Sequence, residues 1–228
     1  MSDQPSDPHI EDVRRLIDTC MSPGFFFVNI GANDGVHNDP IYPFIEQYGW
    51  HGVAVEPDPD VFEELRRNYQ KFPSVVLEQA AITTEPPRLY RIGKGPFEYA
   101  QWMSQITAAS EARVREIIGL VRTYGWLGSV PKDLEEYVQP IDVPCMTFED
   151  LVRRHSIERI DYLNIDVEGG DLEVLAQVDL DRFRNRLLCI EMDPERDFRA
   201  ADAERRLEKL GYQAYKGLMF FSVFYLRE

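Results

Sequence analysis

The chain has 228 residues, 44% of them hydrophobic, and this length and composition fit one compact domain with a buried core. It carries 25 basic and 40 acidic residues, a net charge of −15, so its surface repels the phosphates of nucleic acids and of anionic lipids. No run of about 18 apolar residues occurs, so no membrane span is indicated. We therefore expect neither nucleic acid nor membrane among its partners.

The N-terminal sequence and the cysteines indicate the cellular location, and the pattern of elements indicates the domain boundaries. The polar, acidic N-terminus lacks the basic-then-apolar pattern of a signal peptide. The three cysteines are an odd number and show no metal-type spacing. We therefore interpret them as inert thiols, as expected in a reducing compartment. We expect a cytoplasmic protein with a loose N-terminal tail over residues 1–8. A single domain over 9–228 would follow, with a lid-like insert at about 93–140.

In the first half of the chain, amphipathic helices alternate with apolar strands. The predicted elements are a helix over 9–20, a strand over 25–30, a helix over 41–49, a strand over 51–57, a helix from Pro59, a strand over 74–82 and a short extra strand over 88–92. Asp39 and Asp58 each precede a proline, which predicts a capping aspartate followed by proline at the first helical position.

The second half repeats this alternation after the insert, which holds one helix over 109–125. The predicted elements are a helix with Thr147 and Asp150 in a capping box, a strand over 159–167, a helix over 169–178, a strand over 186–193, a helix over 200–210 and a hairpin over 212–226 that turns at Lys216–Gly217. The pattern predicts an α/β fold with a mostly parallel, doubly wound sheet and a C-terminal antiparallel hairpin.

The stretch "FFFVNIGANDGVHNDP" ends a buried strand in a glycine-rich turn. Gly31 and Gly35 let the backbone turn tightly and approach a ligand closely. Asn33 stands where a dinucleotide-binding turn has its second glycine, which argues against a bound pyrophosphate. A tight turn without any ligand is the alternative interpretation.

Glu56 ends the second strand, at the edge of the sheet where ligands bind in such folds. Its carboxylate could accept hydrogen bonds from both hydroxyls of a ribose. In these acidic surroundings a cationic sulfonium cofactor fits better than a nicotinamide dinucleotide. The alternative is that Glu56 only holds the turn before Pro57.

The segment "NIDVEGGDLEVL" places Asp166 at the tip of the fourth strand, facing the same way as Glu168. Gly169 and Gly170 turn the chain at once, and Asp171 is predicted to cap the next helix. We expect Asp166 to have a functional role and Asp171 a structural one.

The chain resembles FkbM-type methyltransferases, which use S-adenosylmethionine, in five ordered blocks: "VNIGANDGVHNDPIYPFI", "GVAVEPDPDVFEELRRNY", "VVLEQAAI", "VPCMTFEDLVRRHSIERIDYLNIDVEGGDLEVL" and "IEMD". The resemblance runs from about Val28 to Asp193. It implies a class I methyltransferase fold, Rossmann-like, with a seven-stranded sheet whose last strand is antiparallel. Asn29 departs from the pattern, because many methyltransferases have an acid there.

The resemblance also implies roles for single residues. Asp166 would lie beside the reacting methyl group and contact the cofactor. The remaining cofactor-binding residues would be Gly31, Ala32, Asn33 and Gly35 at the methionine part, Glu56 and Pro57 at the ribose, and Gln79, Ala80 and Ala81 at the adenine.

The implied reaction is O-methylation of a small hydroxylated molecule, either a sugar or glycan or a secondary metabolite. A general base would take the hydroxyl proton, with His37 and Asp166 as the candidate catalytic residues and Glu191 also in range. Alternatively, a divalent ion such as magnesium would bind the hydroxyl, held by Asp166, Glu191 and Asp193 as in catechol O-methyltransferase. Glu191 and Asp193 as solvent-facing caps are the other interpretation.

Three other functions stay open: an N-methyltransferase, a non-catalytic module that binds a cofactor or a partner, and a nicotinamide dehydrogenase. The insert is expected to select the acceptor through Tyr99, Trp102, Ser104 and Gln105. The sequence leaves both the identity of the acceptor and a homo-oligomer open.

Overall fold

The computed structural model describes residues 8–20, 24–37, 39, 41–85, 88–95, 103, 106–124, 130–192, 199–217 and 222–227. Several predicted positions lie outside this described part: residues 1–7 of the tail predicted over 1–8, Asp193, and the insert residues Tyr99, Trp102, Ser104 and Gln105. Pro8, the last residue of the predicted tail, instead begins the first helix.

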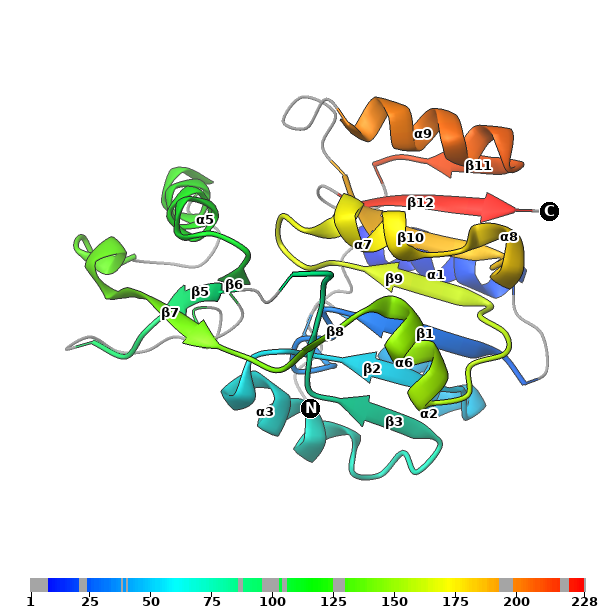
Figure 1. Cartoon of the computed structure of the whole chain (residues 1–228), viewed down its shortest axis with the longest axis horizontal. Helices are drawn as coiled ribbons and strands as arrows, with labels where there is room; N and C mark the ends of the chain where they lie inside the picture. The colour runs from blue at the N-terminus through cyan, green and yellow to red at the C-terminus, as the bar shows by residue number, and fades with distance from the viewer. Residues whose placement is uncertain are drawn as a thin grey trace.

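A seven-stranded sheet forms the centre of the molecule (Figure 1). Its strands are β1 (Phe26–Ile30), β2 (His51–Val55), β3 (Val75–Glu78), β9 (Tyr162–Ile165), β10 (Leu187–Glu191), β11 (Tyr212–Tyr215) and β12 (Ser222–Arg227). They lie in the order β11-β12-β10-β9-β1-β2-β3. The five strands from β10 to β3 pair in parallel, whereas β12 runs antiparallel to both its neighbours. This topology confirms the predicted class I methyltransferase fold.

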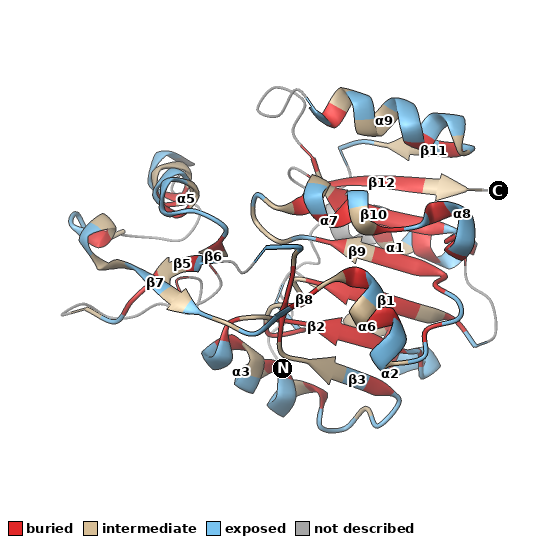
Figure 2. Ribbon diagram, viewed as in Figure 1, coloured by how far each residue is buried: buried red, intermediate tan, exposed pale blue. Residues whose placement is uncertain are grey.

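Helices cover both faces of this sheet, because successive strand residues point to opposite sides. The helices on one face are α1 (Pro8–Cys20), α2 (Tyr42–Tyr48) and α3 (Pro59–Tyr69), and those on the other are α6 (Phe148–Arg154), α7 (Asp171–Gln177), α8 (Leu180–Phe183) and α9 (Arg199–Lys209). In β1, Phe27 packs with the first group and Val28 with the second. Figure 2 shows the buried residues concentrated in the strands, between exposed outer helix faces.

The insert forms a small lobe beside the sheet (Figure 1). Its elements are β5 (Arg88–Ile92), β6 (Thr107–Ala108), α5 (Glu111–Tyr124), the 3₁₀ helix η1 (Leu134–Tyr137) and β7 (Val138–Asp142). β5 pairs antiparallel with both β6 and β7, and Ile92, Val114 and Leu134 are buried in a separate apolar cluster. All of β5 pairs with β7, and these two strands reach beyond the predicted bounds of 93–140, since β5 begins at Arg88 and β7 ends at Asp142.

Both predicted capping devices in the middle of the chain are confirmed. The Asp58 carboxylate accepts the Asp60 amide, 2.9 Å away, at the start of α3. Thr147 and Asp150 form the expected reciprocal capping box on α6.

Three expectations of local structure were wrong. The strand predicted over 74–82 ends at Glu78, and β4 (Ala81–Ile82) instead pairs in parallel with β8 (Cys145–Met146). Helix α2 starts at Tyr42 with Ile41 as its N-cap, so Asp39 does not cap it directly. The register of the hairpin pairs Tyr215 with Phe224, so its connection is longer than a two-residue turn at Lys216–Gly217.

No helix in the described part of the chain is both long and apolar enough to cross a membrane.

Gly52 and Gly119 provide a test of the packing between β1 and β2. A Cβ on Gly52 would lie 2.2 Å from the backbone oxygen of Phe27, whereas one on Gly119 in α5 would meet nothing within 4 Å. We expect Gly52→Ala to lower the free energy of unfolding by about 1–3 kcal/mol. Gly119→Ala, in a helix interior, should raise it by roughly 0.5–1 kcal/mol. Urea unfolding measures both, and equal effects would contradict this account of the sheet.

Candidate functional site

A cavity of about 550 Å³ opens beside the residues that follow β1, β2 and β9. Its walls include Gly31 after β1, Glu56 after β2 and Asp166 after β9, which is where ligands bind in parallel α/β sheets. The insert contributes an apolar wall that includes Ile106 and Ile117. Among the described residues that line it, five are acidic and none is lysine or arginine: Asp39, Glu56, Asp166, Glu168 and Glu173.

The glycine turn is fixed by contacts with its neighbours. The amides of Gly31 and Ala32 both donate to the Val55 carbonyl at 2.9 Å. Gly31 has φ +83°, and a Cβ there would lie 1.7 Å from the Asp166 carbonyl oxygen. The turn therefore requires glycine at this position because it lies directly against the end of β9.

Gly35 has a packing role in this structure. It does not line the cavity, and a Cβ there would come within 3 Å of the side chains of Leu65 and Tyr69 in α3. Gln79 is also absent from the cavity lining among the described residues. The other residues expected to bind the cofactor do line it: Gly31, Ala32, Asn33, Glu56, Pro57, Ala80, Ala81 and Asp166.

Glu56 connects the turn after β1 with the start of α3. Its carboxylate accepts the Asn33 amide at 3.0 Å and the Asp58 amide at 2.9 Å, so it does hold the turn before the helix. Burial raises the pKa of Glu56 to about 7, although the two amides favour the ionised form. The residue is 6% exposed and still borders the cavity, so a bound ligand would reach the remaining lone pairs of its oxygens.

His37 lies at the rim of the cavity and contacts a buried acid. Its Nδ1 atom is 2.5 Å from Oδ2 of Asp34, which is 1% exposed. The other Asp34 oxygen accepts the amides of Val36 and His37. Asp34 was not among the predicted site residues, although its spacing of three positions from His37 within the turn was a usable signal.

A row of polar side chains crosses the sheet at the back of the cavity. Asn29 accepts a hydrogen bond from Asn164, 2.8 Å away on β9, and donates to Asp39 at 3.4 Å. Asp39 also accepts the Tyr69 hydroxyl and the Ile41 amide. Burial raises the pKa of Asp39 to about 7. Asn29, the departure from the family pattern, is thus buried and hydrogen-bonded to Asp39, whose place in the site the sequence did not indicate.

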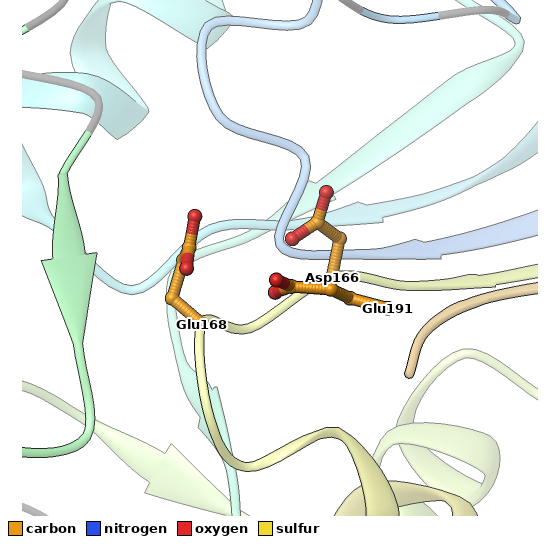
Figure 3. A group of neighbouring side chains, drawn as sticks. All are labelled: Asp166, Glu168 and Glu191. Carbon is orange, nitrogen blue, oxygen red and sulfur yellow. The ribbon is translucent and has the colours of Figure 1, made fainter. Parts of the chain in front are cut away.

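Three carboxylates meet where β9 and β10 end (Figure 3). Oxygens of Asp166, Glu168 and Glu191 all lie within 4.8 Å of one another. Arg113 of α5 reaches this cluster, and its Nη2 atom donates to Glu168 at 3.0 Å and to Glu191 at 2.8 Å. Asp166 and Glu191 are thus brought together as expected, whereas the third predicted metal ligand, Asp193, lies outside the described residues. Glu168 joins them with φ +53°, a rare backbone conformation for a residue other than glycine.

The carboxylates of this cluster perturb one another. Burial raises the pKa of Glu191 well above its usual range, and the charges of Glu168 and Asp166 act in the same direction. The same two causes, desolvation and then repulsion by Glu168, raise the pKa of Asp166. Because Asp166 remains open to the cavity, its desolvation is only partial. Arg113 opposes these effects, so the cluster depends on a cation supplied by the insert.

Asp171 does not cap its helix. The N-cap of α7 is Gly170, and the Asp171 carboxylate instead accepts the amides of Val167 at 2.8 Å and Gly169 at 3.0 Å. It therefore holds the turn that carries Asp166 and Glu168, which is a structural role as expected.

Comparison with known proteins gives one family. The model of the methyltransferase FkbM domain matches residues 29–215. No curated protein matches the chain.

Several solved methyltransferase structures are similar to this chain at low sequence identity. Precorrin-6y C5,15-methyltransferase from Geobacter metallireducens is 15% identical, with 94% of this chain and 86% of that one covered and a TM-score of 0.41. Fibrillarin from Aeropyrum pernix, with natively bound S-adenosyl-L-methionine, is 11% identical, with 95% and 74% covered and a TM-score of 0.45. Human methyltransferase 10 domain containing protein is 12% identical, with 98% and 84% covered and a TM-score of 0.47.

The family assignment rests on the match to the family model, which includes the glycine turn, Glu56, Asp166 and Glu191. The chain therefore belongs to the FkbM family of S-adenosylmethionine-dependent methyltransferases.

Proposed function

We propose that this protein transfers a methyl group from S-adenosylmethionine to a hydroxyl group of a small molecule, with His37 as the general base. The acceptor is a sugar or glycan or another hydroxylated metabolite. The observation that carries the proposal is the contact of 2.5 Å between Nδ1 of His37 and the buried Asp34, at the rim of the cavity.

The cavity suits this cofactor. Its acidic lining, without lysine or arginine among the described residues, favours a cationic ligand and disfavours a pyrophosphate. In this proposal the turn from Gly31 to Asn33 holds the methionine part, and Glu56 accepts the ribose hydroxyls. Ala80 and Ala81 border the adenine. When bound, S-adenosylmethionine supplies a methyl carbon that the acceptor oxygen attacks, and the electrons of the breaking carbon–sulfur bond stay on sulfur.

His37 takes the proton of the acceptor hydroxyl at Nε2. A carboxylate can only accept hydrogen bonds, so Nδ1 of His37 carries the hydrogen shared with Asp34, and Nε2 is the basic nitrogen of the neutral ring. Asp34 then stabilises the charged imidazolium that forms, in the way a buried acid supports the histidine of a catalytic triad. Asp166 lines the same cavity, and we assign to its carboxylate the stabilisation of the sulfonium charge.

We assign no step to a divalent metal. The carboxylates of Glu168 and Glu191 are already bridged by the guanidinium of Arg113, which supplies one positive charge at this position.

The first test replaces the proposed base. We expect His37→Gln to lower kcat by about 10²–10⁴-fold, the usual contribution of a general base, without changing the affinity for S-adenosylhomocysteine. His51→Gln, at the start of β2, is the matched control and should behave as wild type. Transfer of tritiated methyl groups gives the rate, and calorimetry gives the affinity. A wild-type rate for His37→Gln would remove His37 from the mechanism.

The second test concerns Glu56 and pH. Hydrogen bonds from ribose hydroxyls favour the ionised carboxylate, so affinity for S-adenosylhomocysteine should rise as pH increases through the pKa of about 7 and then level off. Glu56→Gln should weaken binding by about tenfold or more, because an amide has one oxygen that accepts hydrogen bonds where the carboxylate has two. It should also remove this component of the pH dependence, because an amide does not titrate. Glu158→Gln, on an exposed residue, is the control. A pH profile identical in wild type and Glu56→Gln would show that Glu56 does not contact the ligand.

The third test removes divalent ions. Because Arg113 already bridges Glu168 and Glu191, we expect dialysis against a chelator to leave the rate of methyl transfer unchanged, and added magnesium to have no effect. Loss of activity on chelation, restored by magnesium, would instead support the metal-assisted route.

A further inference from the structure

A second, larger cavity lies next to the first. It has a volume of about 970 Å³ and is bounded by α3, by the turn after β1, and by the end of β5 and Gln139 of β7 in the insert. The two cavities share His37 and Val61. Building on the proposed function, we infer that this second cavity is the acceptor site and that it takes a neutral, polyhydroxylated molecule of the carbohydrate class.

The shared histidine supports the first part of this inference. Methyl transfer needs the acceptor oxygen, the methyl carbon and the base within a few ångströms of one another. A base between two cavities can serve a cofactor in one and an acceptor in the other. The first cavity contains the turn and Glu56, which leaves the second one for the acceptor.

The side chains on the wall support the second part. Among the described residues that line the second cavity, only three are aliphatic, namely Val36, Val61 and Ile92, and none is phenylalanine, tyrosine or tryptophan. The others include carboxylates and amides, the groups that form hydrogen bonds with sugar hydroxyls. A flat phenol requires apolar walls on both faces of its ring, and the described lining does not provide them.

The charges on this wall disfavour an anionic acceptor. Five acidic residues line it, Asp34, Asp58, Asp60, Glu63 and Glu64, against Arg67, Arg91 and Lys94. Arg91 is paired with both Asp58 and Asp60, each at 2.8 Å, so these three residues keep one net negative charge, and the described lining as a whole has two more acids than bases. A phosphorylated or carboxylated acceptor would therefore meet net negative charge, whereas a neutral polyol would not.

Glu64, Lys94 and Gln139 are the best-placed contacts for such an acceptor. Their side chains line the cavity and make no hydrogen bond or ion pair with other described residues. Gln139 lies against Gly93, where a Cβ would be 2.8 Å from its amide carbon. Gln139 lines the second cavity and not the first, so a bulky side chain at position 139 would fill this end of the second cavity.

The test uses the full-length protein, tritiated S-adenosylmethionine and two sets of probes. The first set contains methyl glycosides of glucose, mannose and rhamnose, and the second contains catechol, 4-nitrophenol and sugar phosphates. We expect methyl transfer to at least one glycoside and none to the second set. Transfer to the second set alone, or to neither set, would overturn the inference about the acceptor.

Variants then test the location. Gln139→Trp should lower kcat/KM for the glycoside by about tenfold or more, equivalent to roughly 1.4 kcal/mol, with unchanged affinity for S-adenosylhomocysteine. Lys94→Ala, which adds no bulk, should raise KM by about twofold to tenfold, the effect of one lost hydrogen bond. Gln213→Trp, on exposed β11, is the matched control and should change neither value.

The outcomes separate the two proposals. If the wild-type protein fails to bind S-adenosylhomocysteine, the proposed function itself is wrong. If the cofactor binds and a glycoside is methylated, but Gln139→Trp and Lys94→Ala both behave as wild type, the acceptor does not occupy the second cavity.

Discussion

The arrangement of the site depends on the close approach of Gly31 to the backbone at Asp166. This contact brings the turn after β1 against the end of β9, while two amides of the same turn donate to Val55 at the end of β2. Three neighbouring strands are thereby held together at the edge where they stop. Glu56 then ties the same turn to α3, so the cavity floor is built largely from backbone contacts that no larger residue at position 31 would allow.

Two arginines attach the insert to this floor from opposite sides. Arg91 of β5 pairs with the acids at the start of α3, and Arg113 of α5 pairs with those at the ends of β9 and β10. Both arginines are largely shielded from solvent, so these ion pairs are screened less than surface pairs. The acids that border the cofactor cavity and the acids that border the second cavity are each partly neutralised by the same lobe.

Much of the fold could be predicted from sequence, because buried strands and capped helices leave local patterns. The capping box at Thr147 and the parallel strands around β1 are of this kind. The features that were missed depend on contacts between distant segments. Nothing near Arg113 in the sequence indicates that it meets Glu168, 55 positions away. The break after Glu78 likewise follows from the pairing of β4 with β8. The contact between Asp34 and His37, by contrast, could have been predicted from the local sequence, since the two residues are only three positions apart.

The parallel pair of β4 and β8 has a consequence for how this family can diversify. The chain leaves the central fold at Ala81–Ile82 and returns at Cys145–Met146, and these two short strands are hydrogen-bonded to each other. The insert has its own apolar cluster, and it begins and ends at this pair of short strands, which forms its neck. Its length and sequence can therefore change without moving any strand of the main sheet, much as an antibody loop varies on a constant framework. Selection for new acceptors can act on the parts of the lobe that do not line the first cavity, while Ile106, Ile117 and Arg113 keep their contacts with the main fold. Exchange of lobes that keep these contacts offers a route to engineered specificity.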